Sequence, residues 1–512
     1  MKLSFWIGAP VLFAQAGVSA AWAAPGPPAP RPANVLLIIA DDMGVDKIGS
    51  YAEDADPDYA TDAVYLPDTP VLDEVAATGI RFTDAWASPT CSPSRAALFT
   101  GQYGLRTGIG QPAGMPDATW LESSLTTLAE VMSDAGYATG LFGKWHLGEN
   151  ELPADWEESD LWYDHAGETF EHTVHPMDHG WHRFIGTVNG TLSWNPIAGN
   201  GGYTDWIVLD SECDGCAAPE VTVHYREDYA TDATVDDALT WIGEQTAPWM
   251  AVLSLHAPHT PLELPPEGCS YRAAEDAEPS EDIGIYEEMV ECMDRRIGDL
   301  LEGIEDLDDT LVIFIGDNGT EADLAELDFD DGRGKATTFE SGVRVPLIIA
   351  DGKDIARQQE GWAFSLDWSR SPTVVAGWGR AESTPVHIVD LFATVAEVGR
   401  ADASEGLDSV SLAPILRRES TDPRGPIYTE SFETDGTGVA ALRIGQWKLR
   451  ATVWEAPAGL CRLGYELFNL NNDRFEQNDR SVVDAAILST LKGRLDDLVA
   501  TEPGSWLDVP DC

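Results

Sequence analysis

Positive charge is the feature that this sequence has least of. Its 512 residues include 88 acidic and only 31 basic side chains, which gives a formal net charge of −57. A protein that binds nucleic acid needs a basic face, so we expect no nucleic-acid partner. We interpret the acidic excess mainly as a solubilising surface. It also suits salty water, where charges are screened beyond about 3 Å at about 1 M salt.

Long apolar runs are also missing beyond the N-terminus, so we expect no membrane span. Residues 1–24 combine Lys2, an apolar stretch and then small residues. Ala21-Trp22-Ala23 fits a cleavage site, with Val18-Ser19-Ala20 as a second option. We predict a signal peptide over 1–24, a Pro-rich spacer over 25–33, and export to the periplasm or out of the cell.

Cysteine is sparse and odd in number, since the chain has seven. Export makes disulfides plausible, and pairing by proximity along the chain predicts bonds 213–216, 269–292 and 461–512. Other pairings remain open, because six cysteines allow many connectivities. Cys213 and Cys216 could be half of a zinc site, but no second pair of ligands follows. The cysteine left over is Cys91.

The sequence does contain continuous apolar runs typical of buried parallel strands. They are Asn34–Ala40, Trp249–Leu255, Leu311–Ile315 and Val345–Ala350. Between them, apolar residues at helical spacing predict helices over Leu121–Gly136, Asp232–Ile242 and Tyr286–Ile304. This alternation predicts an α/β fold with a large, mostly parallel sheet flanked by helices. Residues 151–202, rich in Trp, His and Gly, are expected to form long loops.

The pattern changes after about residue 430. Short strand-like segments follow one another, and a last helix is predicted over 482–499. The predicted strands are Val439–Ile444, Trp447–Thr452 and Tyr465–Leu470. We therefore divide the chain into a catalytic domain over 34–430 and a smaller α+β domain, an antiparallel sheet plus a helix, over 431–512.

Two polar pairs follow predicted strands. Asp41-Asp42 comes directly after the first strand, and Asp317-Asn318 comes one glycine after another. Because ligands bind beyond the carboxyl ends of strands in α/β sheets, we expect these side chains to converge. Carboxylate and amide oxygens suit Ca²⁺ or Mg²⁺ rather than a soft metal. The alternative is that each pair merely forms a turn or a helix cap.

The segment around Cys91 has features of an anion site. Ser92 is a good N-cap and Pro93 suits the first position of a helix that ends at Gly101. Cys91 is therefore expected just before a helix N-terminus, where backbone N–H groups favour anions, with Arg95 one turn away. The alternative is an inert buried cysteine.

This segment, Cys-Ser-Pro-Ser-Arg followed by Thr100-Gly101, resembles the signature of the type I, formylglycine-dependent sulfatases of the alkaline-phosphatase-like superfamily. Further motifs match the family in order over roughly residues 33–480. They are Asp41–Gly44, the GKWHLG box Gly143–Gly148, the PHTP motif Pro258–Pro261, the DNG motif Asp317–Gly319, the lysine motif Gly334-Lys335 with Glu340–Pro346, and Glu466–Leu470 with Asp473. Gln102, Phe99 and Gly316 depart from common family residues, which weakens any subfamily assignment.

The resemblance implies a nucleophile and a metal. A maturation enzyme is expected to convert Cys91 to Cα-formylglycine, whose hydrate attacks sulfur. One Ca²⁺ is expected to polarise the sulfate oxygens. Its implied ligands are Asp41, Asp42, Asp317, Asn318 and residue 91.

The resemblance also assigns roles to cations and histidines. Arg95, Lys144 and Lys335 are expected to neutralise the sulfuryl oxygens. His146 is expected to manage the protons of the hydrate, and His259 to protonate the leaving alcohol. His256 is interpreted as a packed neighbour. The scarcity of lysine supports these assignments, because only six of the seven lysines remain after export and Lys144 and Lys335 are two of them.

The sequence therefore predicts a sulfatase, a sulfuric ester hydrolase that acts on a small-molecule or polymeric sulfate ester. Export and the Trp-rich loops favour a sulfated carbohydrate. One alternative is a phosphonate or phosphodiester hydrolase, which shares the fold and the formylglycine. The other is a catalytically inactive binding protein on the same scaffold.

Overall fold

The computed structural model describes most of the chain after residue 33. The described residues are 34–52, 66–113, 119–148, 174–195, 200–213, 220–246, 248–272, 281–325, 332–362, 379–403, 408–419, 424–433, 435–456, 460–502 and 506–507. The predicted signal peptide and spacer lie outside them, as do Cys216 and Cys512. Among the described helices, none has both the length and the apolar composition needed to cross a bilayer.

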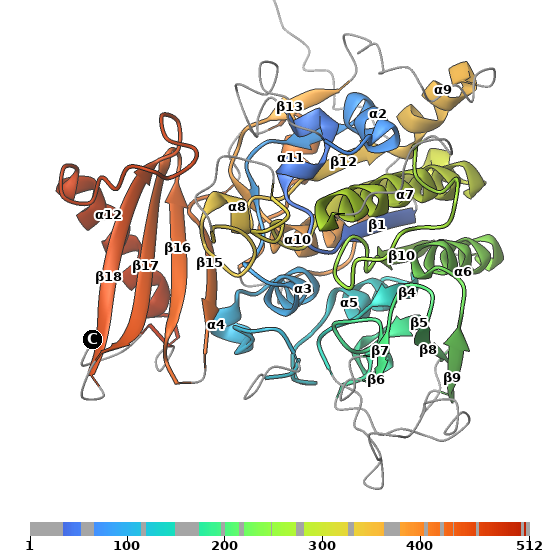
Figure 1. Cartoon of the computed structure of the whole chain (residues 1–512), viewed down its shortest axis with the longest axis horizontal. Helices are drawn as coiled ribbons and strands as arrows, with labels where there is room; N and C mark the ends of the chain where they lie inside the picture. The colour runs from blue at the N-terminus through green and yellow to red at the C-terminus, as the bar shows by residue number, and fades with distance from the viewer. Residues whose placement is uncertain are drawn as a thin grey trace, which may run out of the picture. The chain divides into compact units, whose positions relative to one another are not determined.

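A ten-stranded sheet lies at the centre of the larger domain (Figure 1). Its strands, from one edge to the other, are β13 (Arg380–Glu382), β2 (Ile80–Phe82), β12 (Leu347–Asp351), β11 (Thr310–Gly316), β1 (Asn34–Ala40), β10 (Trp249–Ser254), β4 (Ala138–Lys144), β5 (Arg183–Thr187), β8 (Trp206–Glu212) and β9 (Glu220–Arg226). The central strands β11, β1, β10, β4 and β5 pair in parallel. Antiparallel pairs flank them on both sides. This architecture confirms the predicted α/β class.

Helices cover both faces of this sheet. Along β1, Val35, Leu37 and Ile39 belong to one buried cluster, whereas Leu36 and Ile38 belong to another. This alternation follows from the two-residue period of a strand. The first cluster also contains residues of α3 (Cys91–Thr100), α5 (Leu128–Asp134) and α10 (Asp390–Gly399). The second contains residues of α2 (Pro70–Thr78), α6 (Ala230–Glu244) and α7 (Asp282–Gly303).

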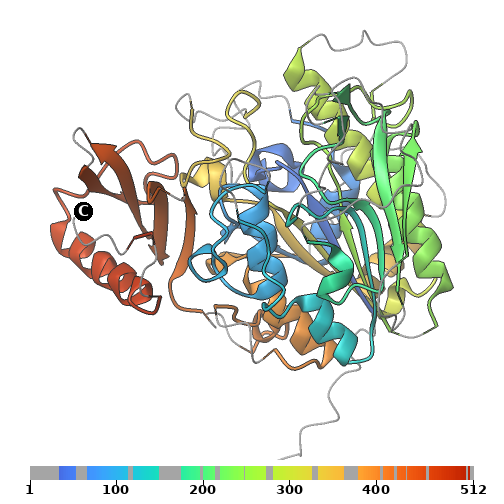
Figure 2. The same cartoon turned by 90° about the horizontal axis from the view of Figure 1, so that it is seen from below.

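A smaller antiparallel sheet forms the C-terminal domain. Its strands follow in chain order as β15 (Ile427–Phe432), β16 (Gly438–Ile444), β17 (Trp447–Ala456) and β18 (Leu460–Asn469). The helix α12 (Ala485–Val499) lies against this sheet and buries Leu491 and Leu495 (Figure 2). The predicted domain boundary at residue 431 falls inside β15. Both domains belong to one compact unit, Pro32–Cys512.

The remaining elements are short. They are β3 (Ala85–Trp86), β6 (Ser193–Asn195), β7 (Asn200–Gly201), β14 (Val386–His387), α4 (Gly104–Thr107), α8 (Glu340–Val343), α9 (Gly352–Trp362), α11 (Ala413–Leu416), and the 3-10 turns η1 (Val45–Lys47), η2 (Gly49–Tyr51), η4 (Pro176–His179) and η5 (Leu307–Asp309).

Three sequence-based expectations about these elements were wrong. The helix predicted over Leu121–Gly136 begins only at Leu128, because Thr127 and Glu130 form a capping box that fixes its start. Within residues 151–202, expected to be loops, Arg183–Thr187 is a strand of the main sheet. The apolar run near residue 347 forms β12, which pairs antiparallel rather than parallel.

The predicted disulfide between Cys269 and Cys292 is confirmed. Cys213 is also disulfide-bonded, but its predicted partner lies outside the described residues. The predicted bond of Cys461 involves Cys512, which also lies outside them. Within the described part of the chain, Cys91 is the free cysteine, and it is buried.

A cavity in the core should destabilise the protein strongly. Leu37, on the central strand β1, has no exposed surface, so Leu37→Ala should lower the free energy of unfolding by about 2–5 kcal/mol. Urea unfolding followed by tryptophan fluorescence measures this change. Val482 is 88% exposed, so the control Val482→Ala should change stability by less than about 0.5 kcal/mol. Equal losses in the two variants would contradict the assignment of β1 to the core.

Candidate active site

The parallel register brings four strand ends to one edge of the main sheet. Ala40, the last residue of β1, is paired with Gly316, the last residue of β11. Ser254 at the end of β10 is likewise paired with Gly143 of β4. The polar residues that follow these strands therefore emerge together, as the sequence led us to expect.

Backbone strain is concentrated at the same edge. Asp42 and His146 have φ values of 64° and 57°, in the left-handed region that non-glycine residues rarely adopt. At Gly143, φ is +98° and an added Cβ would lie 2.0 Å from the Ser254 carbonyl oxygen, so only glycine fits between β4 and β10. Such strain persists only where the surrounding structure fixes it, which is common at functional sites.

Asp41, Asp42, Asp317 and Asn318 form a buried cluster of side chains whose oxygens could bind a metal, which we call the ligand cluster, and each is at most 1% exposed. The Asp42 backbone N–H donates to Asp317 Oδ1 at 3.2 Å, and Asn318 Nδ2 donates to Asp42 Oδ1 at 2.8 Å. Asn318 Oδ1 is buried and accepts no hydrogen bond among the described residues. A buried acceptor without a donor is costly, and a hard cation would satisfy it. The side chains therefore fit a Ca²⁺ ion.

Cys91 is the first residue of α3 and faces this cluster. Its Sγ lies 3.3 Å from Asp41 Oδ1 and 3.9 Å from Asp42 Oδ1. The helix begins at Cys91 with Thr90 as its N-cap, so the expectation that Ser92 caps the helix was wrong. Ser92 Oγ instead donates to the His146 carbonyl and accepts from the Ala113 N–H, because the fold brings these groups within reach.

Three cations balance the carboxylates. Lys144 Nζ donates to Asp41 at 2.5 Å, and Lys335 Nζ donates to Asp42 at 2.6 Å. Arg95 donates to Asp317 Oδ2 through Nε at 3.1 Å and Nη2 at 2.8 Å. Three positive charges and three carboxylates cancel formally. A bound divalent cation would leave two positive charges in excess, which suits an anionic substrate.

The two aspartates nearest Arg95 differ in their proton affinity. Burial raises the pKa of Asp317 to about 7, and repulsion from the Asp41 carboxylate adds to this rise. Burial also opposes the charged form of Asp41, but attraction by Lys144, His259 and Arg95 holds its pKa well below the usual range. A cation bound beside Asp317 would favour its charged form.

The thiol of Cys91 is poorly suited to act as a nucleophile. Burial and the Asp41 carboxylate raise its pKa well above the usual range. The thiolate is the reactive form of cysteine, so the raised pKa disfavours the reactive form of Cys91.

Two predicted histidines flank the cluster. His259 Nε2 lies 3.7 Å from Asp42 Oδ2, while its Nδ1 is 2.6 Å from the Thr260 carbonyl, which fixes the ring orientation. His146 Nε2 bonds the Ala113 carbonyl at 3.1 Å, so its buried Nδ1 is an acceptor with no partner among the described residues. Burial, with Lys144 and Arg95 nearby, places the pKa of His146 well below its usual value.

His256 is buried beside the site, as interpreted from the sequence. Its Nε2 lies 2.8 Å from Thr187 Oγ1, and burial lowers its pKa well below the usual value.

The sequence analysis missed several polar residues that support the site. Ser254 Oγ lies 2.5 Å from Arg95 Nη1 and donates to the Lys144 carbonyl at 2.6 Å. Tyr286 donates to the Asp42 carbonyl at 2.7 Å, and Tyr203 donates to the His259 carbonyl at 2.9 Å. These hydroxyls hold the backbone that carries the charged groups. The only sequence signal was the position of Ser254 at the end of an apolar strand.

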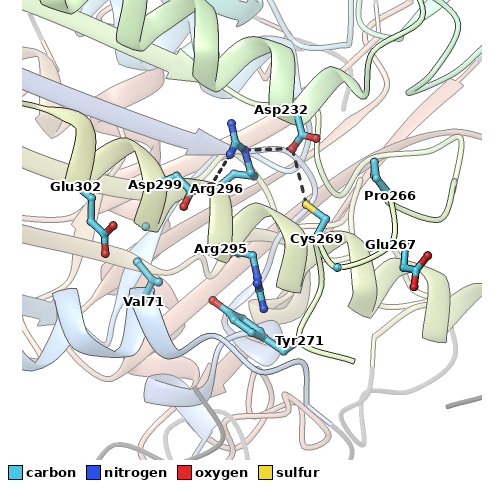
Figure 3. A pocket seen from close by; sticks show the side chains of 12 residues that line it. Val71, Asp232, Pro266, Glu267, Cys269, Tyr271, Arg295, Arg296, Asp299 and Glu302 are labelled. Carbon is cyan, nitrogen blue, oxygen red and sulfur yellow. Dashed lines mark hydrogen bonds and ion pairs between the residues drawn. The ribbon is translucent and has the colours of Figure 1, made fainter. Parts of the chain in front are cut away.

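A separate cavity of about 390 Å³ lies between α2, α6, α7 and residues 266–271 (Figure 3). Arg296 lines it and is paired with Asp232 at 3.1 Å and with Asp299 at 2.5 Å. The second acidic and cysteine group of the described residues, Asp232 with Cys269 and Cys292, lies here. Both cysteines are in a disulfide, so this group is not a metal site.

Known proteins share both the sequence pattern and the fold. The sulfatase family matches residues 33–400. Arylsulfatase A of Bos taurus is 29% identical over 446 residues, which cover 83% of this chain and 76% of that protein. N-acetylgalactosamine-6-sulfatase of Homo sapiens is 28% identical over 456 residues, which cover 83% and 73%.

Solved structures agree with this match at the level of the fold. Ps i-CgsB, also solved in complex with k-i-k-neocarrahexaose, has a TM-score of 0.65 at 24% identity, covering 91% of this chain and 92% of that one. The PsFucS1 sulfatase from Pseudoalteromonas sp. has a TM-score of 0.63 at 20% identity, covering 94% and 92%. With the family pattern matched over most of its length, the chain belongs to the sulfatase family, the sulfuric ester hydrolases.

Proposed function

We propose that this protein is an exported, calcium-dependent sulfatase that hydrolyses sulfate esters of carbohydrates with a formylglycine made from Cys91. The observation that carries the proposal is the position of Cys91. It lies at the N-terminus of α3, 3.3 Å from a carboxylate of the ligand cluster and in a site that contains three cations. Such an arrangement suits a reaction at an anionic group.

Membership of the sulfatase family and the raised pKa of the Cys91 thiol both support a modification at this position. Formylglycine supplies, as its hydrate, the hydroxyl nucleophile that a buried protonated cysteine lacks. Cys91 is only 1% exposed, so a maturation enzyme would have to act before folding is complete. That enzyme is the macromolecular partner that the proposal requires.

The ligand cluster is proposed to hold the metal. Asp41, Asp42, Asp317, Asn318 and residue 91 would hold Ca²⁺, which supplies positive charge next to the sulfate oxygens. Asn318 Oδ1 has no donor among the described residues, and Asp317 has a raised pKa. Both groups would gain from a bound cation.

The cations of the chain are proposed to bind the sulfate group. Arg95 and Lys144 are fully buried, and hydrogen bonds to Ser254 Oγ and to the Lys144 carbonyl fix the Arg95 guanidinium. Lys335 reaches the same cluster by donating to Asp42. Donors that are already oriented stabilise developing charge without further reorganisation.

The histidines are proposed to move protons. His259 Nδ1–H donates to the Thr260 carbonyl, so the doubly protonated ring would give its Nε2 proton to the leaving alcohol and become neutral. His146 is kept neutral by burial and by the neighbouring cations, and its Nδ1 could accept a proton from the nucleophile.

Several observations favour a carbohydrate substrate outside the cytosol. N-acetylgalactosamine-6-sulfatase is named for a sulfated sugar, and Ps i-CgsB has been solved with a neocarrahexaose. The Cys269–Cys292 disulfide and the predicted signal peptide both fit an exported protein.

The nucleophile can be tested by activity and by mass. Protein from a maturing host should release sulfate from 4-nitrophenyl sulfate faster than it cleaves an aryl phosphodiester, and Cys91→Ala should release none. The tryptic peptide Phe82–Arg95 should carry an aldehyde in place of the thiol. Preference for the phosphodiester would favour the phosphodiesterase alternative. Unmodified, inactive protein from a competent host would favour an inactive binding homologue.

Metal removal should weaken both stability and activity. Dialysis against EDTA should abolish sulfate release and lower Tm, and Ca²⁺ at about 100 times its Kd should restore about 2.7 kcal/mol of stability. Scanning calorimetry with added Ca²⁺ measures this effect. The Ca²⁺-dependent shift should shrink in Asn318→Ala and persist in Asp232→Asn, which alters an acidic residue outside the cluster. Equal shifts in both variants would exclude the proposed site.

The role of His259 predicts a dependence on the leaving group. His259→Ala should slow hydrolysis of a sugar sulfate about 10²- to 10⁴-fold, because a sugar alcohol leaves poorly without a proton. A nitrophenyl sulfate should be affected less than about tenfold, since its phenolate leaves unaided. Steady-state kinetics on both substrates measures the difference. The control His256→Ala should slow hydrolysis of the two substrates by equal factors. If His259→Ala also slowed the two substrates by equal factors, the general-acid role would be refuted.

A further inference from the structure

Lys335 lies on a segment, residues 332–343, that reaches the site from outside the parallel strands. We call it the lysine segment. Its backbone is tied to the active-site loops on two sides. The Lys335 N–H donates to the Thr320 carbonyl at 2.9 Å, and the Ala336 N–H donates to the Pro89 carbonyl at 2.8 Å. The position of the Lys335 ammonium beside Asp42 therefore depends on how this segment is held.

The C-terminal domain holds the lysine segment at both ends. Arg333 Nη1 donates to the carbonyls of Phe475 and Glu476, each at 3.0 Å. At the other end, the Glu340 N–H donates to Glu476 Oε2 at 2.5 Å. Phe475 and Glu476 thus contact residues on either side of Lys335.

A buried charge cluster secures this contact. Lys448 Nζ, on β17, lies 3.0 Å from Glu340 Oε1 and 3.0 Å from Glu476 Oε1. The three side chains are each at most 3% exposed. Buried ion pairs are often no more stabilising than apolar packing, so stability alone gives a weak account of the cluster. A requirement that the lysine segment be held in an exact position explains the cluster better.

Two further observations indicate that the lysine segment is held in an exact position. Glu476 has φ 54°, a strained conformation for glutamate that persists only where the surroundings enforce it. Arg450, also on β17, packs over the Phe339 ring at 3.5 Å and donates to Thr338 Oγ1 at 3.1 Å. The middle of the lysine segment is therefore fixed by the same domain as its ends.

We propose that Glu476, held by Lys448, is a positioning residue that fixes the lysine segment and so places the Lys335 ammonium beside Asp42. The C-terminal domain thereby takes part in the reaction through the lysine segment. The kinetic consequence rests on the proposed function, whereas the structural consequence does not. A displacement of about 1 Å at a reacting group can reduce the rate about 100-fold.

Hydrogen exchange tests the structural consequence in protein with unmodified Cys91. Glu476→Ala removes the acceptor of the Glu340 N–H and should speed amide exchange over residues 332–343, including Lys335 and Ala336. Glu476→Gln keeps one carbonyl acceptor and should give an intermediate rate. The control Leu491→Ala destabilises the same domain from α12, and at matched global stability it should leave exchange in the lysine segment unchanged. Equal exchange in Glu476→Ala and Leu491→Ala would overturn the proposal.

A double-mutant cycle tests the kinetic consequence in mature enzyme. Glu476→Ala should lower kcat about 10- to 100-fold. In a Lys335→Ala background it should lower kcat by no more than about twofold, because the group that it positions is gone. A full additional loss in that background would show a role independent of Lys335. If Glu476→Ala does not fold, Glu476→Asp, which keeps the charge but shortens the side chain, replaces it in both experiments with the same expected outcomes.

The two proposals can fail separately. If the mature protein hydrolyses no sulfate ester while Glu476→Ala still speeds exchange over 332–343, the positioning role stands and the sulfatase proposal falls. If sulfate is released but exchange and the cycle show no link to Lys335, only the positioning role falls.

Discussion

The structure depends on placing three buried carboxylates, two buried cations and the partly exposed Lys335 together at one edge of the main sheet. An unpaired charge in such a place costs several kcal/mol, so each charge must arrive with its partner. The partners come from different elements: the loops after β1 and β11, the end of β4, the second turn of α3, and the lysine segment. Pairing therefore locks distant parts of the chain against one another, and the same pairing creates a preformed site for an anion.

Much of the larger fold could be predicted because buried parallel strands are apolar on both faces. The run Asn34–Ala40 became β1 with the predicted bounds, and the strand near residue 311 matched closely. β4 and β5 were not predicted, since glycines interrupt their apolar residues. β8 and β9 were not predicted either, since polar and apolar residues mix toward this edge of the sheet. The direction of a strand relative to its neighbour also could not be predicted from the sequence, because a buried apolar strand has the same composition whether it pairs in parallel or antiparallel. β12 is the example.

The charged residues of the site could be predicted because their types and spacing form motifs. The structure brings Asp41, Asp42, Cys91 and His259 within 4.8 Å of one another. The residues that hold these charged groups in place could not be predicted. Ser254 and Glu476 are ordinary residue types whose partners are backbone atoms or side chains far along the chain. Only the folded chain reveals that a hydroxyl on β10 and a carboxylate after β18 act on the same site.

The location of the cations affects how the protein interacts electrostatically with charged molecules around it. Lys47, Lys144 and Lys448 have no exposed surface, and buried arginines include Arg95, Arg344, Arg424, Arg443 and Arg450. Buried carboxylates accompany these cations inside the protein, so most of the net charge of −57 remains on the outer surface. A sulfated substrate approaches against this field until it reaches the cationic site. Dissolved salt shields the repulsion, so for this protein ionic strength should favour the encounter with an anionic partner, the reverse of ordinary electrostatic steering.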